Sequence, residues 1–421
     1  MGGACTLEAG FIIAFYREIR IMAGLRAIDK NKVCNVVRKR YPKAFGIRKR
    51  LQREKIARLY RCILPEDKIK ECEMFPERKA EVIKPYLRKW KRKLKPVVRE
   101  METVTSNSPV FKDSANLDDV KTDMLFCRLA YGFLPSEYAG FHFEKRSTEE
   151  RKQFASDLDT NVFGYSVNDI AAIQSFIDKG EGYKLVAPYY KRDAIVIEKK
   201  KDFHEFEEFV DKHPFFVKKK VFSSMGKGVE LIDTKSVGTD TMTLFDEIIR
   251  NGKHLLEERV IQHEELAKVN PSSVNTVRCI TFSTKDGIIV PYCFFKAGRK
   301  GSFVDNAGAG GIVVGIDPDS GKCFTDGFTE YGEQYREHPE SKIVFCGFEL
   351  PDWQALIALC KEISSHFPKM KYLSYDLAYT DEGWILIEVN EVGQFIIPQI
   401  VQQRGIKTEL IQFLEHMEKS V

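Results

Sequence analysis

The sequence lacks any apolar run long enough to cross a membrane as one helix, which takes about 20 residues. Its ten cysteines form no CxxC pair and show no regular spacing, which argues against zinc ligands and against a disulfide scaffold. Several cysteines stand within apolar segments, as the reduced core thiols of cytosolic proteins do. We therefore expect a cytoplasmic protein.

The chain does have an ordinary globular composition, with 43% apolar, 12% aromatic and 30% charged residues. Its 421 residues are enough for two or three domains. The charge is divided unevenly: residues 1–100 hold 28 Lys and Arg residues against 11 Asp and Glu residues, a balance of +17, while the remainder has a balance of −12. This change indicates a junction near residue 100, with the polar segment 101–110 as a linker.

The basic segment 1–100 has two interpretations. It can be a solvated helical layer, or a surface for an anionic partner, either a membrane face or a nucleic acid. Apolar and aromatic side chains between residues 11 and 21 interleave with Arg17 and Arg20, as in an amphipathic helix at a membrane interface. No nucleic-acid-binding motif accompanies the charge. Charge alone leaves both interpretations open. A peripheral contact with an anionic membrane or polyanion is the more specific of the two.

Beyond residue 214 the pattern favours an α+β fold with a largely antiparallel sheet. The segment 351–367 has helical periodicity and carries Pro and Asp at its first turn. The segments 372–380 and 383–390 are typical of a β-hairpin, because a short turn separates two apolar runs. Further strands are predicted over 215–218, 229–232, 254–261, 276–283 and 287–296.

A glycine- and serine-rich segment at 223–229 lies between two predicted strands, and Lys218 precedes it. A loop of this kind can fold over a polyphosphate, with its backbone N–H groups and Lys227 offsetting the phosphate charge. The segment lacks the spacing of a P-loop and that of a dinucleotide-binding glycine turn. Taken alone, a hairpin of this composition is more often only a hairpin.

The terminal hairpin carries three oxygen donors. Glu388 and Asn390 are two residues apart on one strand and so share a face, and Asp376 stands on the partner strand. If Asp376 points to the same face, the three side chains offer the hard oxygen ligands that suit Mg²⁺ bridged to phosphates. A polar cluster beside a turn is the alternative, although unpaired carboxylates in an apolar strand are costly.

Two further segments give weaker signals. The extended segment 255–261 can present backbone groups to an adenine, with Glu264 placed to hold a ribose, although an ordinary strand has the same pattern. Arg278 and Lys296 are candidate clamps for an anion, and the glycine-rich segment 305–311 allows a ligand to approach the backbone closely. Tight-turn packing is the alternative explanation of these glycines.

The order of these signals along the chain resembles the ATP-grasp superfamily. The segments 274–278, 304–311 and 387–390 are similar to the ATP-grasp proteins associated with bacterial sugar transfer and clusters for cell-surface polysaccharides. The resemblance covers roughly residues 180–415 and leaves residues 1–100 outside. It implies an ATP-grasp fold with a nucleotide-binding catalytic domain over 201–421. Together with the charge pattern this gives three parts, since a basic helical region over 1–100 and an α/β segment over 101–200 precede that domain.

The resemblance also implies roles for single residues. Arg278 and Lys296 would act in catalysis, although this group often has arginine where Lys296 stands, and lysine lacks the two-pronged fork. The metal ligands would be Asp376, Glu388 and Asn390. The nucleotide would contact Lys218, Ser223, Ser224, Gly226, Lys227, Gly228, Glu257, Glu258, Val260 and Glu264 or Glu265. The substrate would contact Asn275, Asp305 and Asn306.

The implied activity is that of an ATP- and Mg²⁺-dependent carboxylate–amine ligase in the biosynthesis of cell-surface polysaccharide or peptide precursors. A substrate carboxylate would attack the γ-phosphate to give an acylphosphate, and an amine would then displace phosphate to give an amide. A kinase that phosphorylates a hydroxyl is the alternative, because its nucleotide half would look the same. A non-enzymatic module with a degenerate nucleotide site is a third. We expect the protein in the cytoplasm, where its basic segment can contact the inner membrane face.

Overall fold

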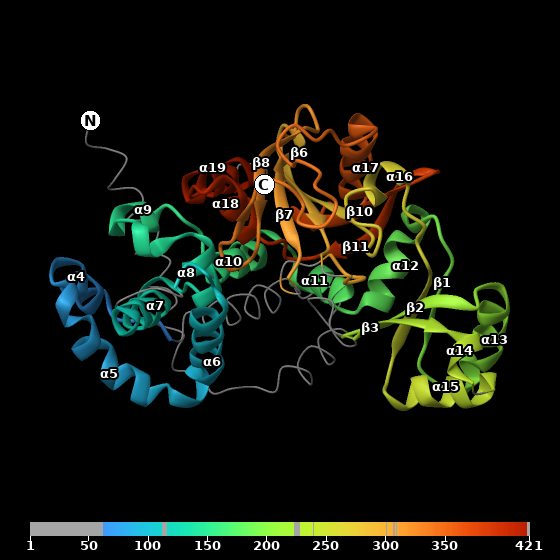
Figure 1. Ribbon diagram of the computed structural model, residues 1–421, viewed down its shortest axis with the longest axis horizontal. Helices are drawn as coiled ribbons and strands as arrows, with labels where there is room; N and C mark the ends of the chain where they lie inside the picture. Colours follow the sequence, from blue (N-terminus) through green and yellow to red (C-terminus); the bar gives the residue numbers. More distant parts are fainter. Residues whose placement is uncertain are drawn as a thin grey trace.

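The computed structural model describes residues 62–418 apart from 112–115, 223–227, 239, 300, 306, 307 and 309. The amphipathic segment predicted over 11–21 lies outside these residues, as do Ser223, Ser224, Gly226, Lys227 and Asn306. The described chain combines a helical bundle with two antiparallel sheets (Figure 1), which confirms the predicted α+β class. Among the described residues, none of the helices is both long enough and apolar enough to span a membrane.

The larger sheet has seven strands in the order β11-β10-β5-β6-β7-β8-β9, and every neighbouring pair is antiparallel. Its strands are β5 (Thr276–Thr284), β6 (Gly287–Ala297), β7 (Ile312–Ile316), β8 (Cys323–Phe328), β9 (Gln334–Tyr335), β10 (Tyr372–Thr380) and β11 (Gly383–Asn390). Helix α17 (Trp353–Ser365), predicted over 351–367, covers one face. Its Leu356, Cys360 and Ile363 are fully buried in a core shared with Cys279 of β5 and Phe295 of β6. The opposite face of the sheet is not covered by α17, so other parts of the chain can pack there.

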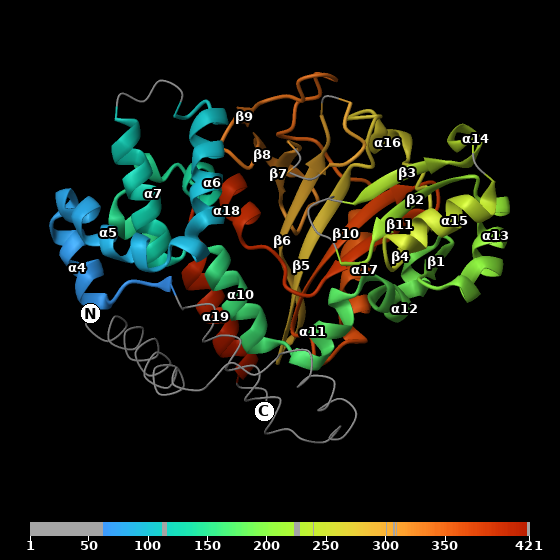
Figure 2. The ribbon, with the colours of Figure 1, turned by 90° about the horizontal axis from the view of Figure 1, so that it is seen from below.

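The smaller sheet has four antiparallel strands in the order β1-β4-β2-β3. Its strands are β1 (Ala194–Ile197), β2 (Phe215–Lys220), β3 (Val229–Asp233) and β4 (His254–Glu258). Helices α13 (Phe203–Lys212) and α15 (Thr241–Arg250) cover one face, where Phe206, Phe245 and Phe216 form an apolar core. Their apolar residues recur at helical spacing, which gives each helix one apolar side for the sheet. The uncovered face of this sheet looks toward the larger sheet (Figure 2).

A bundle of helices forms the N-terminal part of the described chain. Helix α6 (Lys91–Asn107) runs through residues 101–107 with Met101 and Val104 buried, so the linker expected over 101–110 is not observed there. The change of charge falls within one continuous helix: the exposed charged residues of α6 are basic up to Arg99, and Glu102 and uncharged polar residues follow. The other helices of the bundle are α4 (Glu66–Met74), α5 (Lys79–Lys89), α7 (Leu117–Tyr131), α8 (Pro135–Gly140) and α9 (Thr148–Lys152).

The bundle packs directly on the larger sheet. Phe294 of β6, Val313 of β7 and Phe328 of β8 belong to the same apolar core as the buried residues of α5, α6 and α7. Helix α18 (Ile396–Gln402) joins this core through Ile400. The remaining helices are α10 (Asp157–Val167), α11 (Ile170–Ile177), α12 (Lys179–Tyr190), α14 (Thr234–Val237), α16 (Glu264–Ala267), α19 (Lys407–Glu418) and the 3₁₀ turns η2 (Pro76–Arg78), η3 (Phe143–Lys145) and η4 (Lys200–Asp202).

Candidate active site

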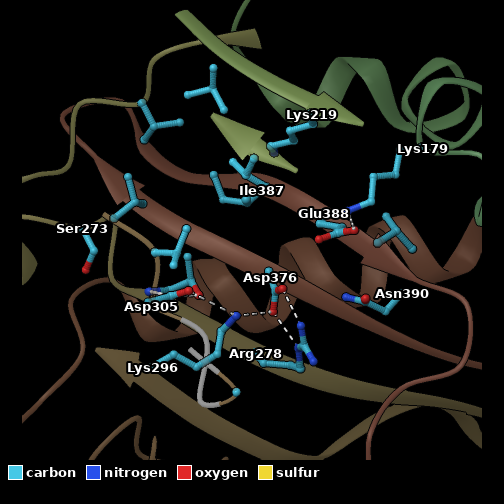
Figure 3. Close-up of a pocket in the computed structure, with 18 of the residues that line it drawn as sticks. Lys179, Lys219, Ser273, Arg278, Lys296, Asp305, Asp376, Ile387, Glu388 and Asn390 are labelled. Atoms are coloured by element: carbon cyan, nitrogen blue, oxygen red, sulfur yellow. Dashed lines mark hydrogen bonds and ion pairs between the residues drawn. The ribbon is translucent and has the colours of Figure 1, made fainter. Parts of the chain in front are cut away.

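A cavity of about 1170 Å³ lies between the two sheets. Its lining comes from β2, β3 and β4 of the smaller sheet and from β5, β6, β10 and β11 of the larger one, and Figure 3 shows part of it. Ligand pockets usually have volumes of about 300–1,000 Å³. The cavity is therefore large enough for a nucleotide together with a second ligand.

The lysine of β2 that lines the cavity is Lys219, not the predicted Lys218. Successive side chains of a strand point to opposite faces, and Phe216 is fully buried against α13 and α15 on the covered face. Lys218 shares that face, and its Nζ lies 2.8 Å from Oε2 of Glu230. Val217 shares the cavity face with Lys219. Because three lysines stand in a row, the sequence does not show which of them faces the ligand.

Glu257 of β4 is buried between two cations. Its carboxylate lies 2.8 Å from Nζ of Lys219 and 2.6 Å from the guanidinium of Arg192, and the residue is 3% exposed. Burial would raise the pKa of Glu257, but the charges of Lys219 and Arg192 outweigh it and hold the pKa below its ordinary value. The ionised carboxylate thus keeps Lys219 extended along the cavity wall.

The segment that follows β4 forms one wall of the cavity. Glu258 and Val260, both predicted to contact the nucleotide, line the cavity together with Gln262. Glu264 and Glu265 do not line it, since both are exposed in the first turn of α16. Acidic residues there interact favourably with the N-terminal end of the helix dipole. The acid expected to hold a ribose is therefore not brought to the cavity.

Gly228 is the one member of the predicted phosphate loop within the described residues. It immediately precedes β3, and its carbonyl accepts a hydrogen bond from the backbone N–H of Lys220 at 3.0 Å. Its φ of 74° is left-handed, a conformation that favours glycine. The residue therefore closes the turn between β2 and β3, and its contact with a nucleotide stays a prediction.

Strands β10 and β11 bring the three predicted oxygen donors to one face. Asp376 lies directly opposite Glu388 in the ladder, Asn390 follows two residues later, and all three line the cavity. A β-bulge at Asp376 leaves Ile387 without a partner, so that Ile387 and Glu388 both line the cavity. The convergence that the hairpin pattern implied is present, while metal binding stays a prediction.

Ion pairs connect the charged side chains of β5, β6 and β10 (Figure 3). Arg278 makes a two-pronged contact with Asp376, in which Nε and one terminal nitrogen each lie 2.6 Å from a carboxylate oxygen. Nζ of Lys296 lies 3.2 Å from Asp376 and 3.7 Å from Asp305. The register places Arg278 beside Asp376 and opposite Phe294, so the cluster is set by neighbouring strands.

Burial acts against each charge in this cluster, and the neighbouring charges decide the outcome. Burial would raise the pKa of Asp376, but Arg278 and Lys296 hold that pKa well below its ordinary value. At Asp305 burial prevails and raises the pKa despite the charge of Lys296. Burial would lower the pKa of Arg278, and Asp376 raises it instead. Asp376 is consequently an ionised group that is able to face a cation at neutral pH.

Lys179 is a basic residue of the cavity that no sequence motif indicated. It is the first residue of α12, which Asp178 caps by accepting hydrogen bonds from the N–H groups of Gly180 at 2.9 Å and Glu181 at 3.1 Å. Nζ of Lys179 lies 2.7 Å from Oε1 of Glu388 (Figure 3). The pair joins residues more than two hundred positions apart, so no local pattern could reveal it.

The predicted substrate residues have different positions. Asp305 lines the cavity, and its Oδ2 accepts the backbone N–H of Thr276 at 2.9 Å. Asn275 is fully buried and does not line the cavity. Its Nδ2 donates to Oε1 of Gln262 and to the carbonyl of Asn270, both at 2.9 Å. Asn275 therefore anchors the segment between α16 and β5, and the expected ligand contact is not made by its side chain.

The donors on β10 and β11 fit a hard divalent cation. Asp376 and Glu388 supply carboxylate oxygens and Asn390 an amide oxygen, a donor set that Mg²⁺ prefers over softer ligands. The Nδ2 atom of Asn390 is buried and has no hydrogen-bond partner among the described residues. Because no hydrogen bond holds that nitrogen, the side chain can present its oxygen to an ion.

A second group of potential ligands fits a metal less well. Ligand atoms of Asp193, His213 and Glu258 lie within 4.8 Å of one another. However, Oδ2 of Asp193 already contacts Nζ of Lys212 and lies 2.8 Å from Nε2 of His213. Of these three residues only Glu258 lines the cavity, so the group is not placed to hold a metal beside a ligand there.

A comparison with protein families matches residues 191–416, more than half of the chain, to the family described as sugar-transfer associated ATP-grasp. Among solved structures, the ATP-grasp ligase PsnB complexed with a minimal precursor is similar at 10% identity and a TM-score of 0.37, over 62% of this chain and 68% of that chain.

D-alanyl-alanine synthetase A from Vibrio cholerae is similar at 10% identity and a TM-score of 0.38, over 62% of this chain and 72% of that chain. A RiPP-associated ATP-grasp ligase from Chryseobacterium gregarium, in complex with ADP and a leader and core peptide, is similar at 12% identity and a TM-score of 0.36, over 63% and 68%. No curated protein matches the sequence. The family match confirms the resemblance that the order of the motifs implied.

Proposed function

Because the chain belongs to the sugar-transfer associated ATP-grasp family, we propose that it is an ATP- and Mg²⁺-dependent ligase that joins a carboxylate to an amine. One observation carries the proposal: basic side chains of both sheets and the oxygen donors of β10 and β11 line a single cavity. Family membership supports an ATP-dependent ligase in general terms. The carbon–nitrogen bond, the acylphosphate and a role in cell-surface polysaccharide or peptide precursors are the finer parts of the proposal.

The nucleotide would bind between the two sheets. Val217, Leu231 and Ile387 supply apolar lining from β2, β3 and β11, suited to the flat faces of adenine. The backbone of segment 258–262 borders the same part of the cavity and offers N–H and C=O groups to the edge of the base. Lys219 lies next to this wall, so the phosphates would extend from it toward β5 and β6.

The phosphate end of the cavity is basic. Arg278 and Lys296 lie close enough to Asp376 to form ion pairs, and Lys179 stands beside Glu388. Asp376, Glu388 and Asn390 would hold Mg²⁺, whose charge would reduce the repulsion between the phosphates and an attacking carboxylate. Arg278 and Lys296 are held beside Asp376 before any ligand arrives. These pairings would open in part when Asp376 binds a cation, which would leave both basic side chains close to the developing negative charge.

In the proposed reaction a substrate carboxylate oxygen attacks the γ-phosphorus, the bond to the β-phosphate oxygen breaks, and ADP leaves. Arg278 and Lys296 would orient the acid and the transferred phosphoryl group. The ammonium group of the second substrate loses a proton to solvent, and the free amine nitrogen attacks the carbonyl carbon. The bond from carbon to the phosphate oxygen breaks, the nitrogen gives up a second proton to the departing phosphate, and an amide forms. The walls of the cavity would limit the access of water to the acylphosphate.

The test is ADP release by the full chain with Mg²⁺ and ATP, measured with candidate acids alone, with acid–amine pairs and with hydroxyl compounds alone. We expect ADP release that requires both an acid and an amine, with an amide detected by mass spectrometry. ADP release with a hydroxyl compound alone, and a phosphorylated product, would establish the kinase instead. The absence of turnover with bound Mg-ATP in every combination would contradict an enzyme of either kind.

We further propose that helices α5 and α6 contact an anionic membrane surface. Between residues 84 and 99 eight Lys and Arg side chains are exposed and no acidic residue stands among them. Trp90, at the junction of the two helices, is half-buried, and Nζ of Lys89 lies 5.7 Å from the centre of a Trp90 ring. Each basic residue near an anionic surface contributes about 1 kcal/mol.

Sedimentation with vesicles tests this contact. We expect binding to vesicles that contain phosphatidylserine, loss of binding in high salt, and no binding to neutral phosphatidylcholine vesicles. Glutamine substitutions at Lys91, Arg92 and Lys93 should weaken binding, whereas the same substitutions at the exposed Lys199, Lys200 and Lys201 of the smaller-sheet region should not. Equal binding to both kinds of vesicle would refute an electrostatic contact, and binding to a nucleic acid alone would replace the membrane as partner.

A further inference from the structure

The cavity has a second end, which none of the sequence motifs covers. Asp157, Thr160 and Asn161 of α10 line it, together with Glu330 from the segment after β8 and Gln394 from the segment after β11. Helix α10 precedes the residues that match the family, which begin at 191. This end of the cavity is thus partly built by residues that precede the family match.

Helix α10 is held against the segment that leaves β11. A Cβ atom on Gly164 would lie 2.9 Å from Cγ2 of Val392, so the helix and this segment are already in close contact. Nδ2 of Asn168, directly after α10, donates to the carbonyl of Glu391 at 2.9 Å and to that of Tyr372 at 2.7 Å. These contacts fix α10 beside the strand that carries Glu388 and Asn390.

The second end of the cavity is lined by acidic side chains. Asp157 and Glu330 are half-buried carboxylates, and among the described residues neither forms an ion pair with a basic side chain. Glu100 lies close enough to raise the pKa of both, after burial, which is the larger cause. The charge of Arg128 and a hydrogen bond from the Asn161 side chain act in the opposite direction on the pKa of Asp157. Among the described residues this end therefore has acidic side chains that lie near one another and near Arg128, but that form no ion pair with a cation.

Thr160 gives an independent indication of a ligand. The residue lines the cavity, is 3% exposed, and its hydroxyl oxygen has no hydrogen-bond partner among the described residues. A threonine hydroxyl within a helix usually bonds to a carbonyl one turn earlier. Because a buried hydroxyl without a partner is unfavourable, the position of Thr160 favours a ligand that forms a hydrogen bond with it in the cavity.

We propose that this end, the α10 subsite, binds the amine substrate as its ammonium ion through Asp157 and Glu330, with a hydroxyl or second polar group of the substrate bonded to Thr160. The proposal rests on the proposed function, because it places the second substrate of that reaction. It also separates the two substrates by charge: the acid belongs at the basic end beside Arg278 and Lys296, and the amine at the acidic end.

The test compares amines with uncharged analogues of the same shape. The probes are glucosamine against glucose, ethanolamine against ethylene glycol, and dialanine against N-acetyl-dialanine, titrated calorimetrically into the full chain with saturating Mg-ADP. A charge-assisted hydrogen bond contributes about 1.5–3 kcal/mol, or about 10–150-fold in Kd. We expect at least one amine to bind about 10-fold or more tightly than its analogue.

Substitutions then locate the preference. In the double variant Asp157→Asn, Glu330→Gln the preference should fall to within about 3-fold, whereas Asp119→Asn and Glu149→Gln, which change exposed acids outside the cavity, should leave it intact. Thr160→Val should weaken binding without lowering Tm, because it removes a hydroxyl that has no partner in the fold. A merely structural threonine would give the reverse result.

Two outcomes overturn the α10 subsite: none of the three amines is preferred, or the preference survives the double substitution. Either result leaves the proposed function standing if acid–amine pairs still release ADP. Conversely, preferential amine binding with no ADP release from any acid–amine pair would support the subsite and refute the ligase. Binding of Mg-ADP to each variant, measured in parallel, shows whether the basic end is unaffected.

Discussion

Lys218 and Lys219 form a matched pair for testing the position of the nucleotide, because they are adjacent and chemically identical but lie on opposite faces of β2. The perturbation is Lys219→Met compared with Lys218→Met. Lys219 lines the cavity, whereas Lys218 pairs with Glu230, whose side chain is 57% exposed. We expect Lys219→Met to weaken Mg-ATP binding and Lys218→Met to leave it nearly unchanged.

The magnitude follows from the environment of each lysine. A hydrogen bond to a charged group contributes about 1.5–3 kcal/mol, so the loss of one phosphate contact should raise the Kd for Mg-ATP about 10–150-fold. Lys219→Met also removes one of two cations from Glu257, which is 3% exposed. The side chain of Lys218 is 14% exposed and that of its partner Glu230 is 57% exposed, so solvent screens the pair in part and its loss should change the free energy of unfolding by about 1 kcal/mol.

Isothermal titration with Mg-ATP and urea unfolding measure the two effects separately. Lys219→Arg serves as the control for charge, and we expect it to bind more tightly than Lys219→Met. A large loss of affinity in Lys218→Met with none in Lys219→Met would show that the phase of β2 deduced here is wrong. Unchanged affinity in both variants would remove β2 from the nucleotide site.

Three further results follow from the structure. Glu388→Ala should abolish ATP turnover and weaken Mg²⁺-dependent nucleotide binding. Its Tm, measured by differential scanning fluorimetry, should stay within a few degrees of the wild type. Turnover at the wild-type rate would contradict the metal assignment. Glu257 has a pKa below its ordinary 4.5, so its ion pairs stabilise the fold above that pH and are lost as the pH falls through the lowered value. The stability advantage of the wild type over Glu257→Gln, measured by urea unfolding, should therefore be present at pH 7 and shrink below about pH 4.5. A chain beginning at residue 101 lacks the first part of α6 and with it the buried Leu94 and Val97, whose burial contributes about 1.5–3 kcal/mol each. Its Tm should therefore fall well below that of a chain beginning at residue 62. Equal Tm values would show that the sheets fold independently of the bundle.

The part of the site that the sequence predicted best depends on short-range geometry. Glu388 and Asn390 share a face because side chains alternate along a strand, and a tight hairpin turn sets the partner strand that carries Asp376. Arg278 and Lys296 lie on strands that are adjacent in both sequence and space. Such contacts follow from spacing and a hairpin, so the pattern contains them.

The part that it missed depends on phase and on long-range packing. The row of lysines around Lys219 hides which face of β2 is covered, since only α13 and α15 settle that question. Lys179 and Thr160 reach the cavity through helices that pack on β11 and on the segment after it, two hundred positions away. The prediction of a linker near residue 100 was wrong for another reason. Charged residues indicate which positions are exposed to solvent, and the charge of the exposed positions can change along a continuous helix.

The charges at the basic end explain why the cavity can be ready for a nucleotide before one arrives. Five basic residues and four acidic residues face one another there: Lys179, Arg192, Lys219, Arg278 and Lys296, against Glu257, Asp305, Asp376 and Glu388. Buried charges are costly unless paired, so this near balance lets the basic side chains be held in place without ligand. The carboxylates of Glu257 and Asp305 can remain with their cations when phosphates bind. If Asp376 and Glu388 hold a metal as proposed, Asp376 would loosen its contacts with Arg278 and Lys296, and Glu388 would exchange Lys179 for the ion. Lys179 would then be free to contact the incoming phosphates, which would couple metal binding at Glu388 to anion binding at α12.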